Sequence, residues 1–403
     1  GVSILVCFLL EKRKKRNANM LLPLHKFVDG VVGLEGLSRG PGFVFLQDCG
    51  AFDAAWKDAL LRYPCVAGVF EATQHECITE WLNNGAREVV IRGGVEDVAV
   101  IGSQLPKERL VYFVEDLDSL KGVLGMDSVG GYVVGDLSHL DVLEKSNKSK
   151  IYMMLEECED IGGYHKRGID IVSSSVDIGQ GLISCLRTDR PDGLYTTVVT
   201  DEYGVALGLV YSSKESLLAS LECGRGVYWS RSRNNLWRKG DTSGAYQELV
   251  RIEFDCDCDA VRFTVRQRGD PASFCHLGTR TCWGNSGGLP HLFQTLQSRK
   301  ANAPEGSYTK RLFDDKALLR NKLLEEAQEV IEAIEEQDPN HVAEEVADLA
   351  YFLFTACCAG GATMEDVNRQ LDMRSLKVKR RPGNAKEYRI KAAEAALNKE
   401  SNF

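Results

Sequence analysis

Residues 66–93, VAGVFEATQHECITEWLNNGAREVVIRG, set the pattern for the first part of the chain. The apolar run VAGVF precedes a stretch with helical spacing, and the apolar run REVVIRG follows it. The same alternation occurs upstream in GFVFLQ and FDAAWKDALLRY. Strands that alternate with helices are typical of βα units around a parallel sheet. We therefore expect an α/β domain of βα repeats over residues 20–186, built on a parallel sheet or barrel-like.

This first domain contains no phosphate-loop spacing and no catalytic constellation. We interpret it as structural or regulatory. Residues 1–19 begin with the apolar run GVSILVCFLL, which is too short to span a bilayer and precedes its basic segment, the reverse of a signal peptide. Our hypothesis is that these residues lie upstream of the native start, and we expect no association with membranes.

The composition limits the class of protein. At roughly 100–200 residues per domain, 403 residues predict several domains. A hydrophobic fraction of 44% and a charged fraction of 27% are typical of soluble globular proteins. The net charge of -9 argues against nucleic acid as a partner. Thirteen scattered cysteines do not form a secreted disulfide framework, which favours the reducing cytoplasm.

A second domain is expected over residues 187–286. The stretch YTTVVTDEYGVALGLVYS, residues 195–212, predicts a hairpin and a mainly β structure. The domain ends near the run GNSGG at residues 284–288, which has the composition of a linker.

The third domain, residues 291–383, has helical apolar spacing throughout. Two long helices are predicted within it, over 323–334 and 341–359, with a turn at Asp338-Pro339-Asn340. Residues 384–403 form a tail. The predicted fold class is therefore a multidomain α+β protein with a barrel-like α/β domain, a mainly β domain and an all-α domain.

Carboxylates and thiols alternate in the second domain. On a strand, Asp255, Asp257 and Asp259 would share one face and suit a hard cation such as Mg²⁺. A solvated strand edge is the alternative interpretation. On the same strand, Cys256 would point to the face opposite the three carboxylates.

Three thiols without a fourth protein ligand, Cys256, Cys275 and Cys282, describe the open, catalytic type of zinc site. One regular strand cannot aim all these groups at one point. We therefore expect either a kinked strand or ligands shared across a homodimer.

The segment GVYWSRSRNNLWRKGDTSG, residues 226–244, is rich in hydrogen-bond donors. Such donors suit phosphate and ribose oxygens. The alternative is a basic surface loop above buried Trp229 and Trp237. The candidate substrate-binding residues are Ser230, Arg231, Ser232, Arg233, Lys239, Thr242 and Ser243.

The motifs YWSRSRNNLWRKGDTSG, DCDCDA and FCHLGTRTCWG, within residues 187–284, closely resemble the phosphoribosyl-AMP cyclohydrolase family. The resemblance implies a dimer whose zinc ligands come from both subunits, and hydrolytic breakage of the purine N1–C6 bond of phosphoribosyl-AMP. It further implies that Cys256, Cys275 and Cys282 bind zinc and that Asp255, Asp257 and Asp259 bind magnesium.

Two residues beside these ligands need separate interpretation. His276 is the candidate proton shuttle, and a histidine merely packed near the metal is the alternative. Cys258 departs from the family, which commonly has a small or polar residue there. We expect Cys258 to be a bystander.

Residues 325–348 contain ten acidic residues and no Lys or Arg. Glu325, Glu329 and Glu332 fall on one helical face, and Glu345 lies one turn before Asp348 on the next helix. Two facing helices would gather carboxylates, whose repulsion calls for a compensating cation. A solvated acidic face is the alternative, although interleaved apolar residues disfavour it.

The pattern of Glu325, Glu326 and Glu329 with Glu345 and Asp348 resembles the magnesium site of all-α nucleotide pyrophosphohydrolases. The preceding PEGSYTKRLFDD narrows the resemblance to the phosphoribosyl-ATP pyrophosphohydrolase family. It implies that magnesium held by these five acids assists cleavage of the α–β phosphoanhydride, with Glu326 and Glu329 catalytic. The candidate phosphate contacts, or else surface charges, are Arg299, Lys300, Lys310 and Arg311.

The domain order resembles the front part of the fungal trifunctional histidine biosynthesis proteins, in which a histidinol dehydrogenase follows. Whether this chain is naturally bifunctional or truncated stays open. One rival hypothesis is a general nucleoside triphosphate pyrophosphohydrolase with a structural zinc module. Another, which the acidic charge disfavours, is a nucleic-acid or regulatory binding protein with a basic tail at residues 377–391.

Overall fold

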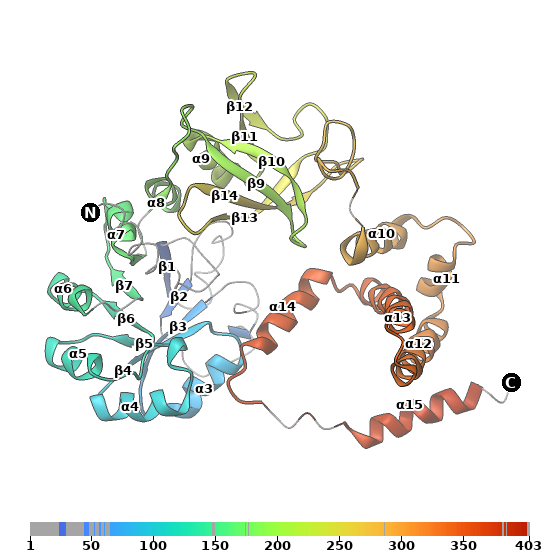
Figure 1. Cartoon of the computed structure of the whole chain (residues 1–403), viewed down its shortest axis with the longest axis horizontal. Helices are drawn as coiled ribbons and strands as arrows, with labels where there is room; N and C mark the ends of the chain where they lie inside the picture. Colours follow the sequence, from blue (N-terminus) through green and yellow to red (C-terminus); the bar gives the residue numbers. More distant parts are fainter. Residues whose placement is uncertain are drawn as a thin grey trace. The chain divides into compact units, whose positions relative to one another are not determined.

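A computed structural model describes residues 24–29, 44–47, 52, 56–57, 60, 65–146, 150–173, 175, 177–285, 287–380, 383 and 385–400. The hypothesis about residues 1–19 lies outside these ranges. The chain forms two compact units (Figure 1). Residues 1–284 and 372–379 make the first unit, and residues 285–371 and 380–403 make the second.

The first unit begins with a closed barrel of parallel strands, as the βα rhythm predicts. Neighbouring strands pair in chain order, and the eighth strand closes onto the first. The strands are β1 (Leu24–Asp29), β2 (Val44–Gln47), β3 (Cys65–Glu71), β4 (Glu88–Arg92), β5 (Leu110–Phe113), β6 (Gly131–Val134), β7 (Ile151–Met154) and β8 (Ile169–Ser173).

Helices follow the strands from β3 onward. They are α3 (His75–Asn83), α4 (Val95–Gln104), α5 (Leu117–Leu124), α6 (Leu137–Lys145), α7 (Ile161–Arg167) and α8 (Ile178–Cys185). Each of the last four begins at an aspartate whose carboxylate accepts a hydrogen bond from a backbone N–H of the first turn, which defines the helix start. The caps are Asp116, Asp136, Asp160 and Asp177.

The barrel interior is filled by one apolar side chain from each of five successive strands. The cluster consists of Val90, Val111, Val133, Tyr152 and Val172. At one end of it lies the buried carboxylate of Glu88, which accepts hydrogen bonds from Lys150 Nζ at 2.6 Å and from the Tyr152 hydroxyl at 3.0 Å. These two donors satisfy the buried charge.

A four-stranded sheet follows the barrel in the same unit. Its order is β10 (Ala206–Ser212), β9 (Tyr195–Asp201), β14 (Ala260–Gln267) and β13 (Gln247–Phe254). The β9–β10 pair is the predicted hairpin, β13 pairs with β14 antiparallel, and β14 runs parallel to β9. The helix α9 (Lys214–Cys223) leads from this sheet to a two-stranded ribbon of β11 (Val227–Ser230) and β12 (Asn235–Arg238).

One prediction about this sheet is wrong. The alternating residues 255–259 are not on a strand: they form the turn that joins β13 to β14, which we name the acidic turn. The Asp255 carboxylate accepts hydrogen bonds from the backbone N–H groups of Asp259 and Ala260, both at 3.1 Å, and so replaces strand pairing by a side-chain-capped turn. The expected opposition of Cys256 and the carboxylates across a strand does not apply.

The second unit is helical. Its helices include α10 (Gly288–Asn302), α11 (Tyr308–Asp314), α12 (Lys316–Glu336), α13 (Pro339–Gly360) and α15 (Glu387–Glu400), and α14 (Met364–Ser375) begins in it. The two long helices were predicted. The turn between them is shorter than predicted, because Gln337 takes a left-handed conformation, Asp338 caps α13 and Pro339 is already its first residue.

Within the described residues, no single helix has the length and apolarity to cross a membrane. The bent pair of α13 and α14 meets the criterion jointly, by length and composition alone.

We predict that Glu88→Ala destabilises the barrel by about 2 to 3 kcal/mol, because Lys150 and Tyr152 lose their shared partner inside the protein. Chemical denaturation followed by circular dichroism measures this. The control is Glu115→Ala, which removes a half-exposed partner of Arg92 and should cost less than about 1 kcal/mol. Equal effects of the two variants would contradict the prediction.

Candidate active sites

Two of the three predicted zinc ligands lie together in the loop after β14. The Cys275 and Cys282 thiols hydrogen-bond with each other. The Cys275 N–H donates to the Thr279 carbonyl at 3.2 Å, and the Cys282 N–H donates to the Leu207 carbonyl on β10 at 2.8 Å. The loop is thus fixed both within itself and to the sheet. We name residues 274–284 the thiol loop.

A glycine on β10 makes room for this loop. A Cβ atom at Gly208 would lie 2.2 Å from Phe274 Cε1 and 3.0 Å from Cys282 Sγ. Real side chains do not approach so closely, so the thiol loop can rest on β10 only where residue 208 lacks a side chain.

The thiol pair has an asymmetric environment. The backbone N–H of Leu277 lowers the pKa of Cys275, whereas burial and then the neighbouring Cys275 raise the pKa of Cys282.

Lys239 lies beside both thiols and is only 5% exposed. Its Nζ donates to the carbonyls of Ala245 at 3.2 Å and Ser273 at 3.3 Å. Lys239, expected in a substrate-binding patch, is therefore a buried cation against the thiol loop.

An ion pair that the sequence analysis missed fixes the same loop. Arg280 lies between the two thiols in sequence and donates to the Asp201 carboxylate at 2.8 Å. Asp201 is 0% exposed and also accepts hydrogen bonds from the backbone N–H groups of Tyr203 and Val205. One buried carboxylate thus holds the β9–β10 turn and the thiol loop together.

The third thiol lies elsewhere in the chain. Cys256 is exposed in the acidic turn, where its sulfur and carboxylate oxygens of Asp255 and Asp257 lie within 4.8 Å of one another. Asp259 is not part of this group. Among the described residues, no candidate metal group joins Cys256 to Cys275 or Cys282.

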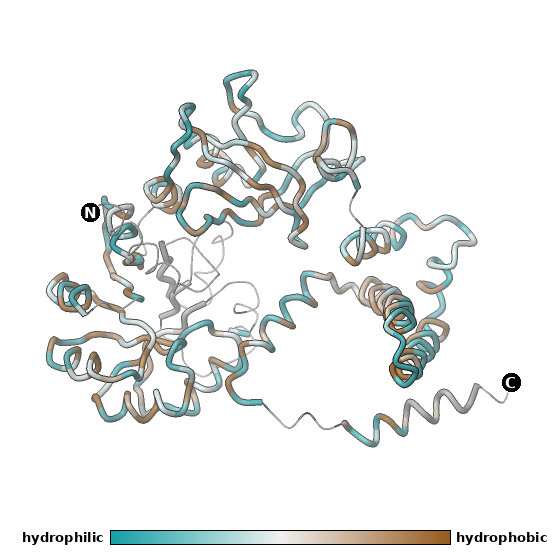
Figure 2. Tube along the Cα trace, in the orientation of Figure 1, coloured by the Kyte–Doolittle hydropathy of each residue, from teal (hydrophilic) through white to brown (hydrophobic). Residues whose placement is uncertain are grey.

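The donor-rich segment forms the β11–β12 ribbon and the turn after it. Ser230 ends β11, and its hydroxyl lies 3.4 Å from that of Ser232. The Arg231 guanidinium stacks 4.1 Å from the centre of the Tyr211 ring on β10. Arg233, Thr242 and Ser243 are exposed, as a solute-binding surface requires. Figure 2 shows the ribbon tip as hydrophilic, in contrast to the apolar stretches of the sheet.

Trp229 and Trp237 are half-buried rather than fully covered, so the alternative of a loop above two buried tryptophans is only partly met. His276 is exposed next to the thiol pair, and its Nδ1 lies 3.9 Å from Cys275 Sγ. This position allows either of the two roles considered for it.

The second cluster lies on α12 and α13, where the structure brings the five predicted acids together. Carboxylate oxygens of Glu325, Glu326 and Glu329 lie within 4.8 Å of one another, and so do those of Glu326, Glu345 and Asp348. Glu326 belongs to both groups and is only 4% exposed. We name these five residues the acid cluster.

Two basic side chains beside the acid cluster, Lys322 and His341, were missed in the sequence analysis. Lys322 lies outside the acidic motif, and His341 was not counted as a charged residue. Lys322 Nζ contacts Glu326 Oε1 at 2.6 Å and Glu325 Oε1 at 2.9 Å. His341 Nε2 lies 3.2 Å from Glu345 Oε1, and its Nδ1 lies 2.7 Å from Glu336 Oε2. The hydrogen bond with Glu336, followed by the charges of Glu336 and Glu345, raises the pKa of His341.

The four basic residues proposed as phosphate contacts are less well placed to bind phosphate. Arg299 Nη1 donates to Thr309 Oγ1 at 3.0 Å, and Lys300 donates to the Cys358 carbonyl. Lys310 is half-buried and Arg311 is exposed. Two of the four therefore already bond to protein groups.

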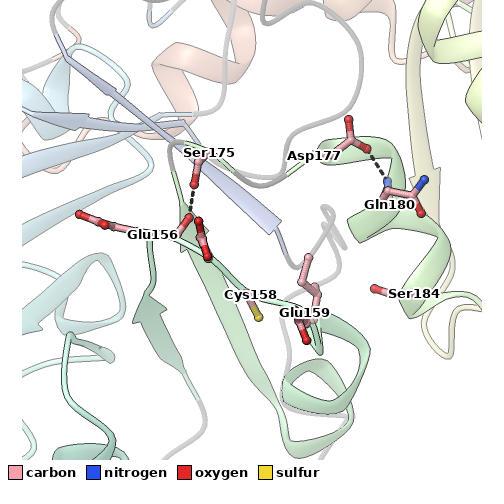
Figure 3. A pocket seen from close by; sticks show the side chains of 9 residues that line it. Glu156, Cys158, Glu159, Ser175, Asp177, Gln180 and Ser184 are labelled. Atoms are coloured by element: carbon pink, nitrogen blue, oxygen red, sulfur yellow. Dashed lines mark hydrogen bonds between the residues drawn. The ribbon is translucent and has the colours of Figure 1, made fainter.

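The barrel has a cavity of its own at the carboxyl ends of β7 and β8, with a volume of about 400 Å³. Figure 3 shows that Glu156, Glu159 and Asp177 lie around it. Glu157 also lines it, and none of the lining residues that the structure describes is Lys or Arg. This is the face where barrel enzymes have their active sites, but such a lining repels phosphate.

The two clusters coincide with two family matches. Residues 208–284 match the phosphoribosyl-AMP cyclohydrolase family, and residues 289–375 match the phosphoribosyl-ATP pyrophosphohydrolase family. Both are hydrolase domains of histidine biosynthesis. A thiol loop with an acidic turn therefore occurs in the first match, and an acid cluster on paired helices occurs in the second.

Curated relatives match about half of the chain. The chain is 52% identical over 220 residues to the histidine biosynthesis trifunctional protein of Kluyveromyces lactis, covering 54% of this chain and 27% of that protein. It is 53% identical over 199 residues to the histidine biosynthesis bifunctional protein his7 of Schizosaccharomyces pombe, covering 49% of this chain and 46% of that protein.

The bifunctional protein HisIE of Gloeobacter violaceus is 38% identical over 200 residues, which are 47% of this chain and 89% of that protein. The chain therefore belongs to the family of histidine biosynthesis proteins that join these two domains. It spans only about a quarter to a half of the length of the fungal relatives.

We predict that Arg280→Ala lowers zinc affinity by about 10- to 100-fold, because the thiol loop loses its buried anchor. Competition with a fluorescent zinc chelator measures this affinity. Arg268→Ala, which removes an exposed pair with Glu248, is the matched control and should leave zinc affinity at the wild-type level. Equal affinities of the two variants would rule out the anchoring role.

Removing one acid should stabilise the metal-free protein. Burial and the charges of Glu326, Glu345 and Glu325 raise the pKa of Glu329. The folded state therefore binds this proton more tightly than the unfolded state, and ionisation of Glu329 reduces stability as pH rises through the raised pKa.

Without magnesium at neutral pH, we expect Glu329→Gln to raise the melting temperature of the helical unit. The gain should disappear well below the ordinary carboxylate pKa, where Glu329 is already protonated in both states. Differential scanning fluorimetry measures the change, with exposed Glu335→Gln as the control. A lower melting temperature for Glu329→Gln at neutral pH would contradict the prediction.

Proposed function

We propose that the chain hydrolyses phosphoribosyl-ATP to phosphoribosyl-AMP and pyrophosphate at the acid cluster, and then opens the purine ring of phosphoribosyl-AMP at the thiol loop. The observation that carries the proposal is that each family match contains the side chains its reaction needs. The buried Glu326 links both carboxylate groups in the second match, and the thiol pair lies in the first.

In the first reaction, a water molecule adds to phosphorus and the α–β phosphoanhydride bond breaks. Magnesium bound by the acid cluster would neutralise the phosphate charge and orient that water. Glu326 is buried and its carboxylate contacts Lys322, which fixes the direction of the carboxylate. Burial and the neighbouring acids raise the pKa of Glu329, which favours Glu329 as a proton acceptor.

Lys322 has a place in the same step. Its ammonium contacts Glu325 and Glu326 from one turn earlier on α12 and packs 5.3 Å from the centre of the Phe352 ring. It reduces the repulsion among these acids. It also supplies a positive charge where the anionic substrate approaches.

In the second reaction, water adds to the purine and the N1–C6 bond breaks. Zinc bound by Cys256, Cys275 and Cys282 would supply a water with a pKa of about 7. The Leu277 N–H favours the thiolate form of Cys275, and a charged Lys239 favours the thiolate form of Cys282. His276 is within reach to accept or return a proton. Donors on the ribbon, such as the half-buried Ser230 and the exposed Arg231, would bind phosphate and ribose.

We propose that magnesium binds Asp255, Asp257 and Asp259, and that the active cyclohydrolase is a homodimer. The separation of Cys256 from the other two thiols supports the dimer, because a second copy can present its exposed acidic turn to the thiol loop of the first. Exposed apolar side chains on α12 and α13 support further association. They are Ile331, Ile334, Val346 and Leu353.

The domain limits, 20–186, 187–286 and 291–383, stay part of the proposal. So does a cytoplasmic location.

The first experiment is a spectrophotometric assay with phosphoribosyl-ATP, magnesium and zinc. We predict that Glu326→Ala lowers pyrophosphate release by on the order of 100-fold or more, because both carboxylate groups lose their shared ligand. Cys275→Ala should stop at phosphoribosyl-AMP with normal pyrophosphate release. Matched controls are Glu335→Ala and Cys223→Ala, two exposed residues outside the clusters.

Hydrolysis of ordinary nucleoside triphosphates, with no turnover of phosphoribosyl-ATP, would replace the proposal by the general pyrophosphohydrolase. Loss of both activities in Cys275→Ala alone would contradict two separate sites.

A further inference from the structure

The barrel has no assigned task, and its own cavity has a lining that repels phosphate. It nevertheless packs into the same hydrophobic core as the four-stranded sheet. Ile161 on α7 and Leu182 on α8 are buried in one cluster with Phe254 and Val261, the residues that flank the acidic turn. The barrel and the sheet that carries the acidic turn therefore share one hydrophobic core.

Cys258 connects the acidic turn with the barrel through contacts of its side chain and its backbone. Its thiol is 1% exposed and lies 3.3 Å from Nε2 of His165, which is itself buried on α7. Its carbonyl accepts a hydrogen bond of 2.9 Å from the N–H of Arg187, just beyond α8. Cys258 thus has one partner on the barrel, His165, for its thiol and a second partner, Arg187, for its backbone carbonyl.

The backbone of Cys258 needs such support. Its φ of 63° lies in the left-handed region, which costs a residue with a Cβ roughly 1 kcal/mol or more. Without outside contacts, a short turn would relax from this conformation. The neighbouring Asp255, Cys256 and Asp257 are the residues whose ligand atoms gather within 4.8 Å, so relaxation would disperse them.

We propose that the barrel positions the acidic turn for metal binding through the contact of His165 with the Cys258 thiol, assisted by Arg187, the first residue after the barrel domain, at the Cys258 carbonyl. The proposal rests on the zinc and magnesium sites proposed above. Cys258 is then a positioning residue: its thiol points to the barrel and is not part of the metal group. The helices that hold these contacts are closely packed, since a Cβ at Gly162 on α7 would lie 2.3 Å from the Ser184 carbonyl on α8.

The experiment measures zinc release from the purified full-length holoenzyme to a chromogenic chelator. Cys258→Gly removes the thiol while permitting the left-handed backbone, and His165→Ala removes its partner. Both should release zinc about fivefold faster than wild type, the factor expected from one lost buried hydrogen bond. Cys258→Ser keeps a hydrogen-bonding group and should stay close to wild type. His139→Ala, on α6 of the same barrel, is the matched control.

Pyrophosphate release from phosphoribosyl-ATP should be unchanged in all four variants, which separates a local effect from general unfolding. Wild-type release rates for both Cys258→Gly and His165→Ala would overturn the inference. If His165→Ala fails to fold, Cys258→Gly decides alone, because glycine does not strain this turn. A wild-type protein that retains no zinc would instead overturn the proposed function, and the inference with it.

Discussion

The cyclohydrolase part of the molecule depends on one buried carboxylate. Asp201 accepts hydrogen bonds from its own turn and an ion pair from Arg280, so the β9–β10 hairpin and the thiol loop form one body. A fully buried aspartate is tolerated only because several donors surround it. The Gly208 contact and the Cys282 backbone bond to β10 then define where the thiols lie.

In the acid cluster like charges lie close together, whereas the Asp201 carboxylate is surrounded by hydrogen-bond donors. Five carboxylates gather on two helices, and among the described residues Lys322 and His341 are their close cationic partners. Their mutual repulsion raises the pKa of Glu329 and is reduced by Lys322 or by a divalent cation. The thiol loop is prearranged by hydrogen bonds, whereas the acid cluster is held by helix packing against its own charge. The two sites should therefore respond differently to metal removal.

Periodicity was sufficient to predict the barrel strands, the β9–β10 hairpin and the paired helices, because each is determined by short-range apolar spacing. It was also sufficient for the acid cluster, since residues one helical turn apart must share a face. The acidic turn was mistaken for a strand because the same alternation arises when Asp255 caps a turn with its own side chain. Asp201–Arg280 and His165–Cys258 join residues far apart in sequence, so no local pattern could reveal them.

The parallel pairing of β9 with β14 has a consequence for biosynthesis of the chain. β9 is made early, but its central partner is the last strand of its sheet, with β10, α9, the ribbon and β13 in between. Closing so long a loop is entropically slow, and the sheet cannot form until the ribosome has released all of β14. The α12–α13 hairpin needs only neighbouring residues. During translation one edge of β9 therefore stays unpaired until β14 has been made, whereas the barrel strands precede the sheet in the chain and can pair before it.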